Sequence, residues 1–226
     1  MSHPTINMRG MRTIAVANLK GGVGKTTIAV NLACALAGGR SSVALVDADV
    51  QASASDWLSD ESPLQAHSLP LEDENPRSIA AWVAGVRALN ADIVVIDCPP
   101  HLSAVTGAAI GLADLVLLPC GPSVADVRAT ARTVGLIREA RKVRKGAPKA
   151  LIVPNRVDRR STTGKGFPLA LAALDERVSP VLVIRQAHAD ATGSGTWIGA
   201  YAPHSPAAVE IQALADAVVA MLNKGA

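Results

Sequence analysis

The chain has 226 residues, about half of them hydrophobic, and a formal net charge of only +3 at pH 7. This length suits one domain with a substantial core, and no apolar run is long enough for a signal peptide or a membrane span. Cys34, Cys98 and Cys120 stand far apart without CxxC spacing or His-rich neighbours, so neither a disulfide framework nor a zinc site is indicated. We expect a soluble protein of the reducing cytosol, with residues 1–11 as a loose tail and residues 12–226 as the domain.

Six short apolar runs alternate with stretches rich in Ala and Leu that are long enough for helices. The predicted strands cover residues 13–18, 43–47, 92–97, 115–119, 150–155 and 180–184. Apolar strands that are each followed by a helix are typical of a parallel sheet covered on both faces. We therefore predict an α/β fold with a doubly wound, mostly parallel sheet, and ligands beyond the carboxyl ends of its strands. The Pro- and Glu-rich segment 60–76 is predicted to be a surface loop.

The first predicted strand leads into the sequence KGGVGKTT, residues 20–27, and then into an Ala-rich helix. Glycines allow successive backbone N–H groups to face phosphate oxygens, and the amino end of the helix adds its dipole. Lys25 would then contact the outer phosphates, and Thr26 would supply a hydroxyl to Mg²⁺. The sequence thus predicts a phosphate-binding loop (P-loop), against the alternative of a plain Gly-rich turn. Its predicted phosphate-binding residues include Gly21, Gly22, Val23 and Gly24.

Carboxylates follow two further predicted strands. Asp47 and Asp49 come after the strand at 43–47, and Asp97 ends the strand at 92–97. A single aspartate after a strand commonly caps the next helix, but three in this order favour ligands for magnesium and its waters.

These residues resemble the ParA/MinD family of deviant P-loop ATPases, in the segments KGGVGKTT, DADVQASASDW, VVIDCPP and SPAAVEIQAL. The resemblance covers nearly the whole chain after residue 11 and implies a P-loop NTPase fold with ATP and Mg²⁺ as cofactors. It implies that Lys20 reaches across a homodimer to the phosphates bound by the other subunit, much as an arginine finger does. It also implies that Asp49 positions the attacking water, that Asp47 and Asp97 help to hold magnesium, and that Thr27 contacts the α-phosphate. The alternative for Lys20 is a solvated loop charge.

The chain departs from the family pattern in two places. Leu19 stands where MinD-like proteins have glycine, and Val50 replaces the usual proline of Asp-x-Asp-Pro-Gln, although Gln51 remains. We expect the second change to alter the stiffness of the loop without abolishing its chemistry. His101 follows the third strand, where a polar residue of a switch loop is favoured over a general base, since phosphoryl transfer needs little help from a base.

Asn155, within PNRVD, ends the strand at 150–155 and can hydrogen-bond a purine edge. The motif is superficially similar to the guanine-reading Asn-Lys-x-Asp of GTPases, but Arg156 replaces the lysine. The family resemblance favours ATP over GTP.

Positive charge is concentrated between residues 132 and 165, which hold eleven Lys and Arg against two acidic residues. On the helix expected after Pro122, the side chains of Val127, Ala131 and Val134 form an inward apolar stripe. A second stripe is basic and predicts phosphate-directed, sequence-tolerant DNA binding, because aromatic residues for stacking bases are few. The alternative is a solvated helix end whose cations complement the helix dipole. The predicted DNA-binding residues are Arg138, Arg141, Lys142 and Lys145.

The last predicted helix argues against membrane targeting. It carries Ile211, Leu214, Val218 and Met221 on one face and has only one lysine, as expected for a helix packed on the core. Without an amino-terminal helix-turn-helix extension, the chain resembles the short ParA type.

We therefore expect an ATPase that dimerises on ATP, binds DNA nonspecifically and segregates DNA or positions a large cargo over the nucleoid. Its hydrolysis would be stimulated by a ParB-like or other cargo-bound adaptor. The alternatives are a MinD-like or DNA-independent nucleotide switch and a metabolic enzyme similar to dethiobiotin synthetase.

Overall fold

The computed structural model describes residues 10–39, 41–59, 62–71, 73–158 and 160–223. Within these ranges seven strands form one parallel sheet, in the order β3-β2-β4-β1-β5-β6-β7. The strands are β1 (Arg12–Val16), β2 (Val43–Asp47), β3 (Ala66–Ser68), β4 (Ile93–Asp97), β5 (Leu115–Cys120), β6 (Lys149–Pro154) and β7 (Arg177–Val178). The predicted parallel α/β fold is confirmed.

Five of the six predicted strands match observed strands to within one or two residues. The prediction at 180–184 is wrong, because the seventh strand is Arg177–Val178 and the later segment joins β6 only through a bridge between Val157 and Val183. Pro180 has no N–H to give to the ladder, so regular pairing stops there. The short β3 lies inside the segment predicted to be a loop, at the edge of the sheet beside β2.

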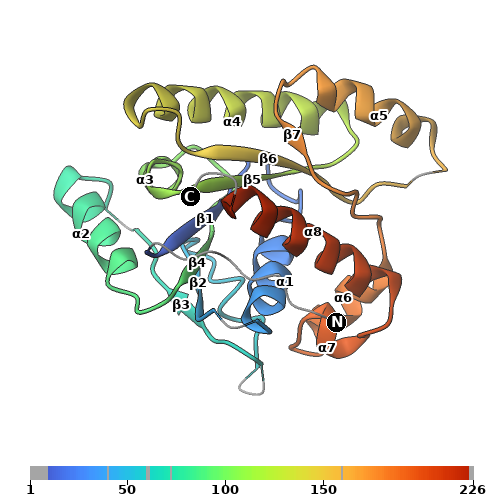
Figure 1. The fold of residues 1–226 in the computed structure, drawn as a ribbon, viewed down its shortest axis with the longest axis horizontal. Coiled ribbons are helices and arrows are strands. Elements are labelled where there is room, and N and C mark those ends of the chain that lie inside the picture. Colours follow the sequence, from blue (N-terminus) through green and yellow to red (C-terminus); the bar gives the residue numbers. More distant parts are fainter. Residues whose placement is uncertain (1–9, 40, 60–61, 72, 159, 224–226) are drawn as a thin grey trace.

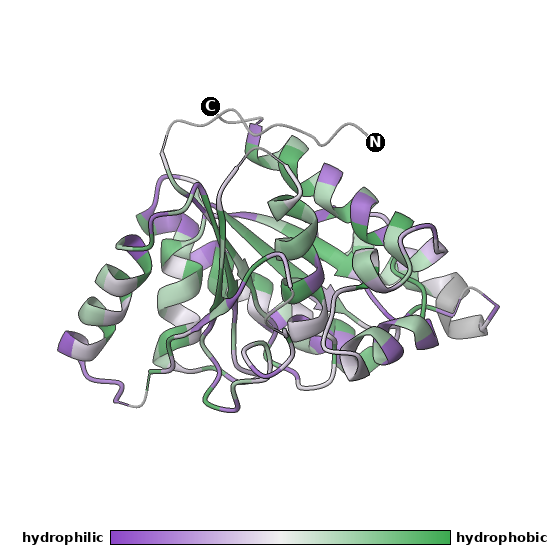
Figure 2. Ribbon diagram, turned by 90° about the horizontal axis from the view of Figure 1, so that it is seen from below, coloured by the Kyte–Doolittle hydropathy of each residue, from purple (hydrophilic) through white to green (hydrophobic). Residues whose placement is uncertain are grey.

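Helices cover both faces of the sheet (Figure 1). One face packs against α1 (Lys25–Ala37), α6 (Gln186–Gly193), α7 (Ile198–Tyr201) and α8 (Pro206–Asn223). The other packs against α2 (Pro76–Arg87), α3 (Ala104–Leu112), α4 (Val124–Val143) and α5 (Thr162–Ala172). Alternate strand residues point to opposite faces, so Ile14 and Val16 lie in the first core and Ala15 in the second. Both cores are apolar, as Figure 2 shows for the green strands at the centre.

Helix α8 packs against α1, and the four residues predicted for its inner face are all buried. Among the described residues α8 is also the one helix whose length and composition would allow it to cross a membrane, yet half of it is buried inside the protein. The helices of a packed core pass the same test of composition, so this feature is explained by the core.

The amino-terminal tail and the cysteines are placed as follows. Of the predicted tail, residues 1–9 lie outside the described residues, Gly10 is exposed, and Met11 packs partly buried against the face covered by α2 to α5. The three cysteines are free and buried, as predicted.

The sheet order decides where the functional loops meet. Strand β1 lies between β4 and β5, so the loop after β1 is flanked by the loops that follow those two strands. Asp47 and Asp97, the last residues of β2 and β4, are partners in register. The carboxyl edge of the sheet therefore brings the P-loop and the predicted carboxylates together.

Candidate nucleotide-binding site

The P-loop turns sharply between β1 and α1. Gly22 and Gly24 have φ angles of 74° and 90°, in the left-handed region that glycine adopts without a Cβ clash. Helix α1 begins directly afterwards, with no side-chain cap and no acidic residue in its first turn. Its first N–H groups and the positive end of its dipole are therefore available to an anion.

Two side chains that follow β6 hold the outside of this loop. Asn155 donates from Nδ2 to the carbonyl of Val23 at 2.7 Å, and Arg156 donates from Nη1 to the carbonyl of Gly22 at 2.8 Å. A Cβ on Gly24 would come within 2.3 Å of the Asn155 Nδ2, so the glycine is required for this close approach. Arg156 itself has a φ of 58°, a conformation that costs a non-glycine residue about 1 kcal/mol. These two contacts fix the backbone that would surround the phosphates.

Lys25 lies inside the loop. Its side chain is only 7% exposed, and its Nζ donates to the carbonyl of Lys20 at 3.2 Å. Burial lowers the pKa of Lys25, and the nearby Asp97, Cys98 and Asp49 oppose that shift. A poorly solvated ammonium group that donates to a backbone carbonyl gains strongly from a phosphate.

The surroundings of Asp97 are suited to a divalent cation. Its carboxylate is buried, and Oδ1 has no hydrogen-bond partner. Burial raises the pKa of Asp97 to about 7, against the lowering effect of a hydrogen bond with Thr26. No group of three or more His, Cys, Asp or Glu side chains among the described residues could enclose a metal. Mg²⁺ does not need one, because it commonly takes one or two protein oxygens together with phosphate and water. Thr26 and Asp97 therefore fit Mg²⁺, which would neutralise charge on the phosphates.

Asp47 is committed to the backbone of the following loop. Its Oδ2 accepts from the N–H groups of Ala54 and Ser55 at 2.8 and 2.9 Å, and its Oδ1 accepts from the N–H of Asp49 at 3.2 Å. Asp47 therefore shapes the loop that carries Asp49, and its role as a magnesium ligand stays a prediction.

Asp49 lines the large pocket beside the P-loop, as do Thr26 and Thr27. Its Oδ1 accepts from the N–H of Gln51 at 3.0 Å, which holds the carboxylate in a tight turn. The adjoining Val50 is 61% exposed, so the residue that replaces the family's proline points into solvent. The role of Asp49 in positioning the attacking water stays a prediction.

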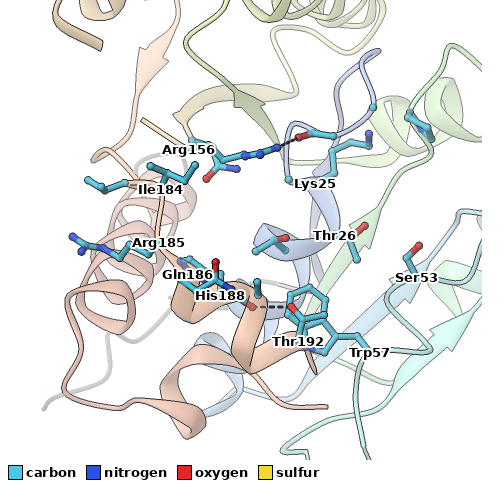
Figure 3. A pocket seen from close by; sticks show the side chains of 18 of the residues that line it. Lys25, Thr26, Ser53, Trp57, Arg156, Ile184, Arg185, Gln186, His188 and Thr192 are labelled. Atoms are coloured by element: carbon cyan, nitrogen blue, oxygen red, sulfur yellow. Dashed lines mark hydrogen bonds between the residues drawn. The ribbon is translucent and has the colours of Figure 1, made fainter. Parts of the chain in front are cut away.

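The pocket has a volume of about 670 Å³, within the range of small-molecule sites. At one end it is lined by P-loop residues that include Lys25 and Thr26 (Figure 3), and Asp49 and Pro100 also line the pocket. The other end is lined by Trp57, from the loop after β2, and by residues of α6 and of the segment that leads into it, which sequence reasoning did not identify. The expectation that ligands bind beyond the carboxyl ends of the strands was a signal for the second group, which follows the predicted strand at 180–184. Trp57 is the last residue of the resemblance segment DADVQASASDW, but no role was predicted for it. The residues missed at this end include Ile184, Arg185, Gln186, His188 and Thr192.

Lys20 lies on a different side of the loop from Lys25. It does not line the nucleotide pocket but a neighbouring cavity of about 420 Å³, where its Nζ contacts Oδ1 of Asp126 at the start of α4. Sequence reasoning did not single out Asp126, although the spacing Ser-x-x-Asp is a helix-start signal. His101 is exposed and outside the pocket, in the loop after β4, which is the position expected of a switch-loop residue.

The basic stripe is only partly free. Arg138, Lys142 and Lys145 are exposed, but Lys145 lies beyond the end of α4, and Lys142 pairs with Glu139. Arg141 makes two bonds to Glu176 at 2.6 and 3.0 Å and a third, at 2.8 Å, to the carbonyl of Pro148. Because its donors hold α4 against the segment before β7, Arg141 is poorly placed for DNA.

The inner face of α4 also differs from its prediction. Val134 is buried and Val127 partly buried, but Ala131 is exposed, and the helix instead buries Thr130, Thr133 and Ile137. The buried face of α4 is therefore rotated from the predicted one. The two threonines can be buried there because their hydroxyls donate to backbone carbonyls one turn earlier in the helix.

Comparisons with known proteins agree with this geometry. The family model for the CobQ/CobB/MinD/ParA nucleotide binding domain matches residues 14–191. The chain is 36% identical over 181 residues to maintenance of carboxysome distribution protein A of Halothiobacillus neapolitanus, covering 77% of this chain and 80% of that protein. It is 31% identical to the chromosome-partitioning ATPase Soj of Thermus thermophilus, over 95% of this chain and 98% of Soj.

Solved structures show the same fold. Apo McdA from Cyanothece superposes with a TM-score of 0.78 at 20% identity, covering 92% of this chain and 99% of McdA. MinD of Pyrococcus horikoshii, solved with Mg-ADP, superposes with a TM-score of 0.73 at 20% identity, over 92% and 96% of the two chains. From the P-loop, the carboxylates that surround it and the matched family model, it follows that the chain belongs to the CobQ/CobB/MinD/ParA nucleotide-binding family, as an ATPase of the ParA/MinD type.

Proposed function

We propose that this protein is a Mg²⁺-dependent ATPase that dimerises on ATP, binds DNA nonspecifically and positions a large cargo over the nucleoid. Residues 12–226 act as one domain in the cytoplasm. A cargo-bound adaptor, ParB-like or of another kind, stimulates hydrolysis. The relative from Halothiobacillus is named for carboxysome distribution and Soj for chromosome partitioning, and both names support a cargo-positioning role.

The observation that carries the proposal is that the two lysines of one P-loop lie on different sides. Lys25 lines the nucleotide pocket, whereas Lys20 is 39% exposed beside a separate cavity. Lys25 therefore serves the phosphates bound by its own chain. Lys20 is available to the phosphates of a second copy, where a cation stabilises the charge of the transferring phosphoryl group.

Other residues of the site complete the hydrolytic machinery in this proposal. Asp49, in its tight turn at the pocket wall, positions the attacking water. Thr26 and Asp97 hold Mg²⁺, and Thr27 contacts the α-phosphate. Asn155, which donates to the P-loop and lines the same pocket, hydrogen-bonds the purine edge in this proposal.

The exposed cations at the carboxyl end of α4 form the DNA surface in this proposal: Arg138, Lys142 and Lys145. Arg141 does not belong to this surface, because its guanidinium group is the partner of the nearly buried Glu176. Lys142 and Glu139 are both about 70% exposed, so their ion pair is weak and is readily exchanged for a phosphate.

The test is a pair of double variants with the same change in net charge. Lys142→Gln with Lys145→Gln should weaken ATP-dependent DNA binding for unrelated sequences alike and reduce the slope of log K against log salt by about 2. Arg77→Gln with Arg87→Gln, at exposed positions on α2, should leave the slope unchanged. Equal slopes in all three proteins would refute the assigned surface, and no DNA binding by the parent with ATP would favour a DNA-independent nucleotide switch.

A further inference from the structure

The contact between Lys20 and Asp126 joins the P-loop to the first turn of α4. The Nζ of Lys20 donates to Oδ1 of Asp126, and the two side chains are 39% and 12% exposed. They are 106 residues apart in the sequence, and the sheet order brings them together because β5, which precedes α4, lies beside β1. In this structure the lysine that our proposed function gives to a second copy is thus engaged within its own chain.

Asp126 is held firmly in the position where it receives Lys20. It belongs to a capping box at the start of α4, in which its N–H donates to the Oγ of Ser123 and its Oδ2 accepts from the N–H and Oγ of Ser123. A Cβ on Gly121 would come within 2.6 Å of the same Oδ2, so the chain leaves room for the carboxylate there. Burial raises the pKa of Asp126, but the hydrogen bonds from Lys20 and Ser123 outweigh it and keep the pKa below its ordinary value. The carboxylate is therefore charged at neutral pH.

The backbone around Lys20 is fixed, whereas its side chain can leave. The N–H of Lys20 donates to Oδ1 of Asn18 at 3.2 Å, and Nδ2 of Asn18 donates to Oγ1 of Thr130 in α4 at 2.9 Å. These bonds attach the start of the loop to α4 whatever the lysine side chain does. A change of partner for Lys20 therefore needs only rotation of a flexible side chain.

We propose that Asp126 is a positioning residue for Lys20, which holds this lysine in a resting position in the nucleotide-free monomer and so raises the ATP concentration needed for dimerisation. The proposal rests on the proposed function, in which Lys20 acts on the phosphates of a second copy. One carboxylate holds one ammonium group, whereas a bound triphosphate offers several charged oxygens. The phosphates bound by a second copy can therefore take Lys20 from Asp126, but the free energy of the Lys20–Asp126 pair must first be overcome.

The variant Asp126→Asn removes the charge and keeps an oxygen for the capping box. It should form ATP dimers at about three- to tenfold lower ATP concentration than the parent, as expected for loss of one partly exposed ion pair. Its unstimulated hydrolysis should rise in parallel. Asp126→Ser, which also keeps an oxygen at this helix position, provides a second variant with the same expectation should the first fold poorly.

Two controls separate this effect from damage to α4. Ser123→Ala removes the capping hydroxyl but keeps the backbone N–H of position 123 on Oδ2 and the Lys20 contact with Oδ1, so its dimerisation should match that of the parent. In a Lys20→Ala background, Asp126→Asn should change nothing further, because the residue that it acts through is absent. Dimerisation is measured by sedimentation over an ATP titration with Mg²⁺.

A second readout does not depend on dimerisation. In the nucleotide-free monomer, acetic anhydride should modify Lys20 more slowly than the exposed Lys145 of the same molecule, and mass spectrometry measures both. Asp126→Asn should raise the ratio of Lys20 to Lys145 modification several-fold, because the paired ammonium is released. Ser123→Ala should leave the ratio unchanged.

Each unfavourable result refutes a different statement. A parent that stays monomeric at saturating ATP refutes the proposed function and, with it, the role of Asp126 in dimerisation. A parent that dimerises while Asp126→Asn needs as much ATP refutes the role of Asp126 alone. An unchanged Lys20 modification ratio refutes the resting pair itself, and an equal gain from Ser123→Ala assigns the effect to the helix cap.

Discussion

Replacing Asp97 with asparagine should change the stability of the nucleotide-free protein, relative to the parent, more favourably at pH 8 than at pH 5. Asp97 is 1% exposed and has an oxygen without a partner, and burial raises its pKa from 3.8 to about 7. Because the folded pKa lies above the unfolded one, its stabilising contribution is fully present below pH 3.8 and is lost as the pH rises through 7. Asparagine has nearly the same shape and does not titrate.

The size of the effect follows from the shift. About three pKa units correspond to about 4 kcal/mol between the low-pH and high-pH limits, of which about 2 to 3 kcal/mol falls between pH 5 and pH 8. The substitution should also destabilise the protein by about 1–3 kcal/mol at every pH, because the new amide leaves a buried N–H group without an acceptor. The diagnostic quantity is therefore the change with pH in the difference between the variant and the parent.

The assay is urea denaturation of both proteins at pH 5, 6, 7 and 8, without nucleotide and with a chelator present. The stability of the variant minus that of the parent should increase steadily with pH. A difference that does not depend on pH, or that falls as the pH rises, would show that Asp97 is not a strained buried carboxylate. The reasoning that makes it a cation site would then fail.

Two further predictions concern single side chains. Lys25→Ala should abolish ATP binding in equilibrium dialysis with labelled ATP and Mg²⁺, because the poorly solvated ammonium inside the P-loop is lost, and normal binding would contradict the assignment of the loop. Arg141→Ala should destabilise the protein by about 2–4 kcal/mol in urea denaturation, since Glu176 would be left nearly buried without its partner, whereas Lys142→Ala, at an exposed pair, should cost under about 1 kcal/mol. Equal losses would show that the Arg141 pair has no special structural role.

Local patterns in the sequence were sufficient for the fold class and for most of the phosphate site. Near-continuous apolar runs identified five strands, because a strand buried on both faces leaves few positions for polar residues. The P-loop could be recognised because its glycines, its lysine and the start of α1 are adjacent in the chain, so their geometry is set locally. The strand at 180–184 was mispredicted for the same reason that the others succeeded, since apolar composition alone does not show that Pro180 interrupts the ladder.

Tertiary structure alone decided which partners the charged residues take. The pattern that placed Arg141 in a basic stripe contained nothing of Glu176, 35 residues later, which occupies its guanidinium group. In the same way, Asp47 has the sequence position of a metal ligand, but folding turns its oxygens toward backbone N–H groups. Lys20 meets Asp126 only because β5 lies beside β1 in the sheet. Such partners are distant in the chain, and the long side chains that join them obey no periodicity, so they are determined by the packing of the whole sheet and its helices.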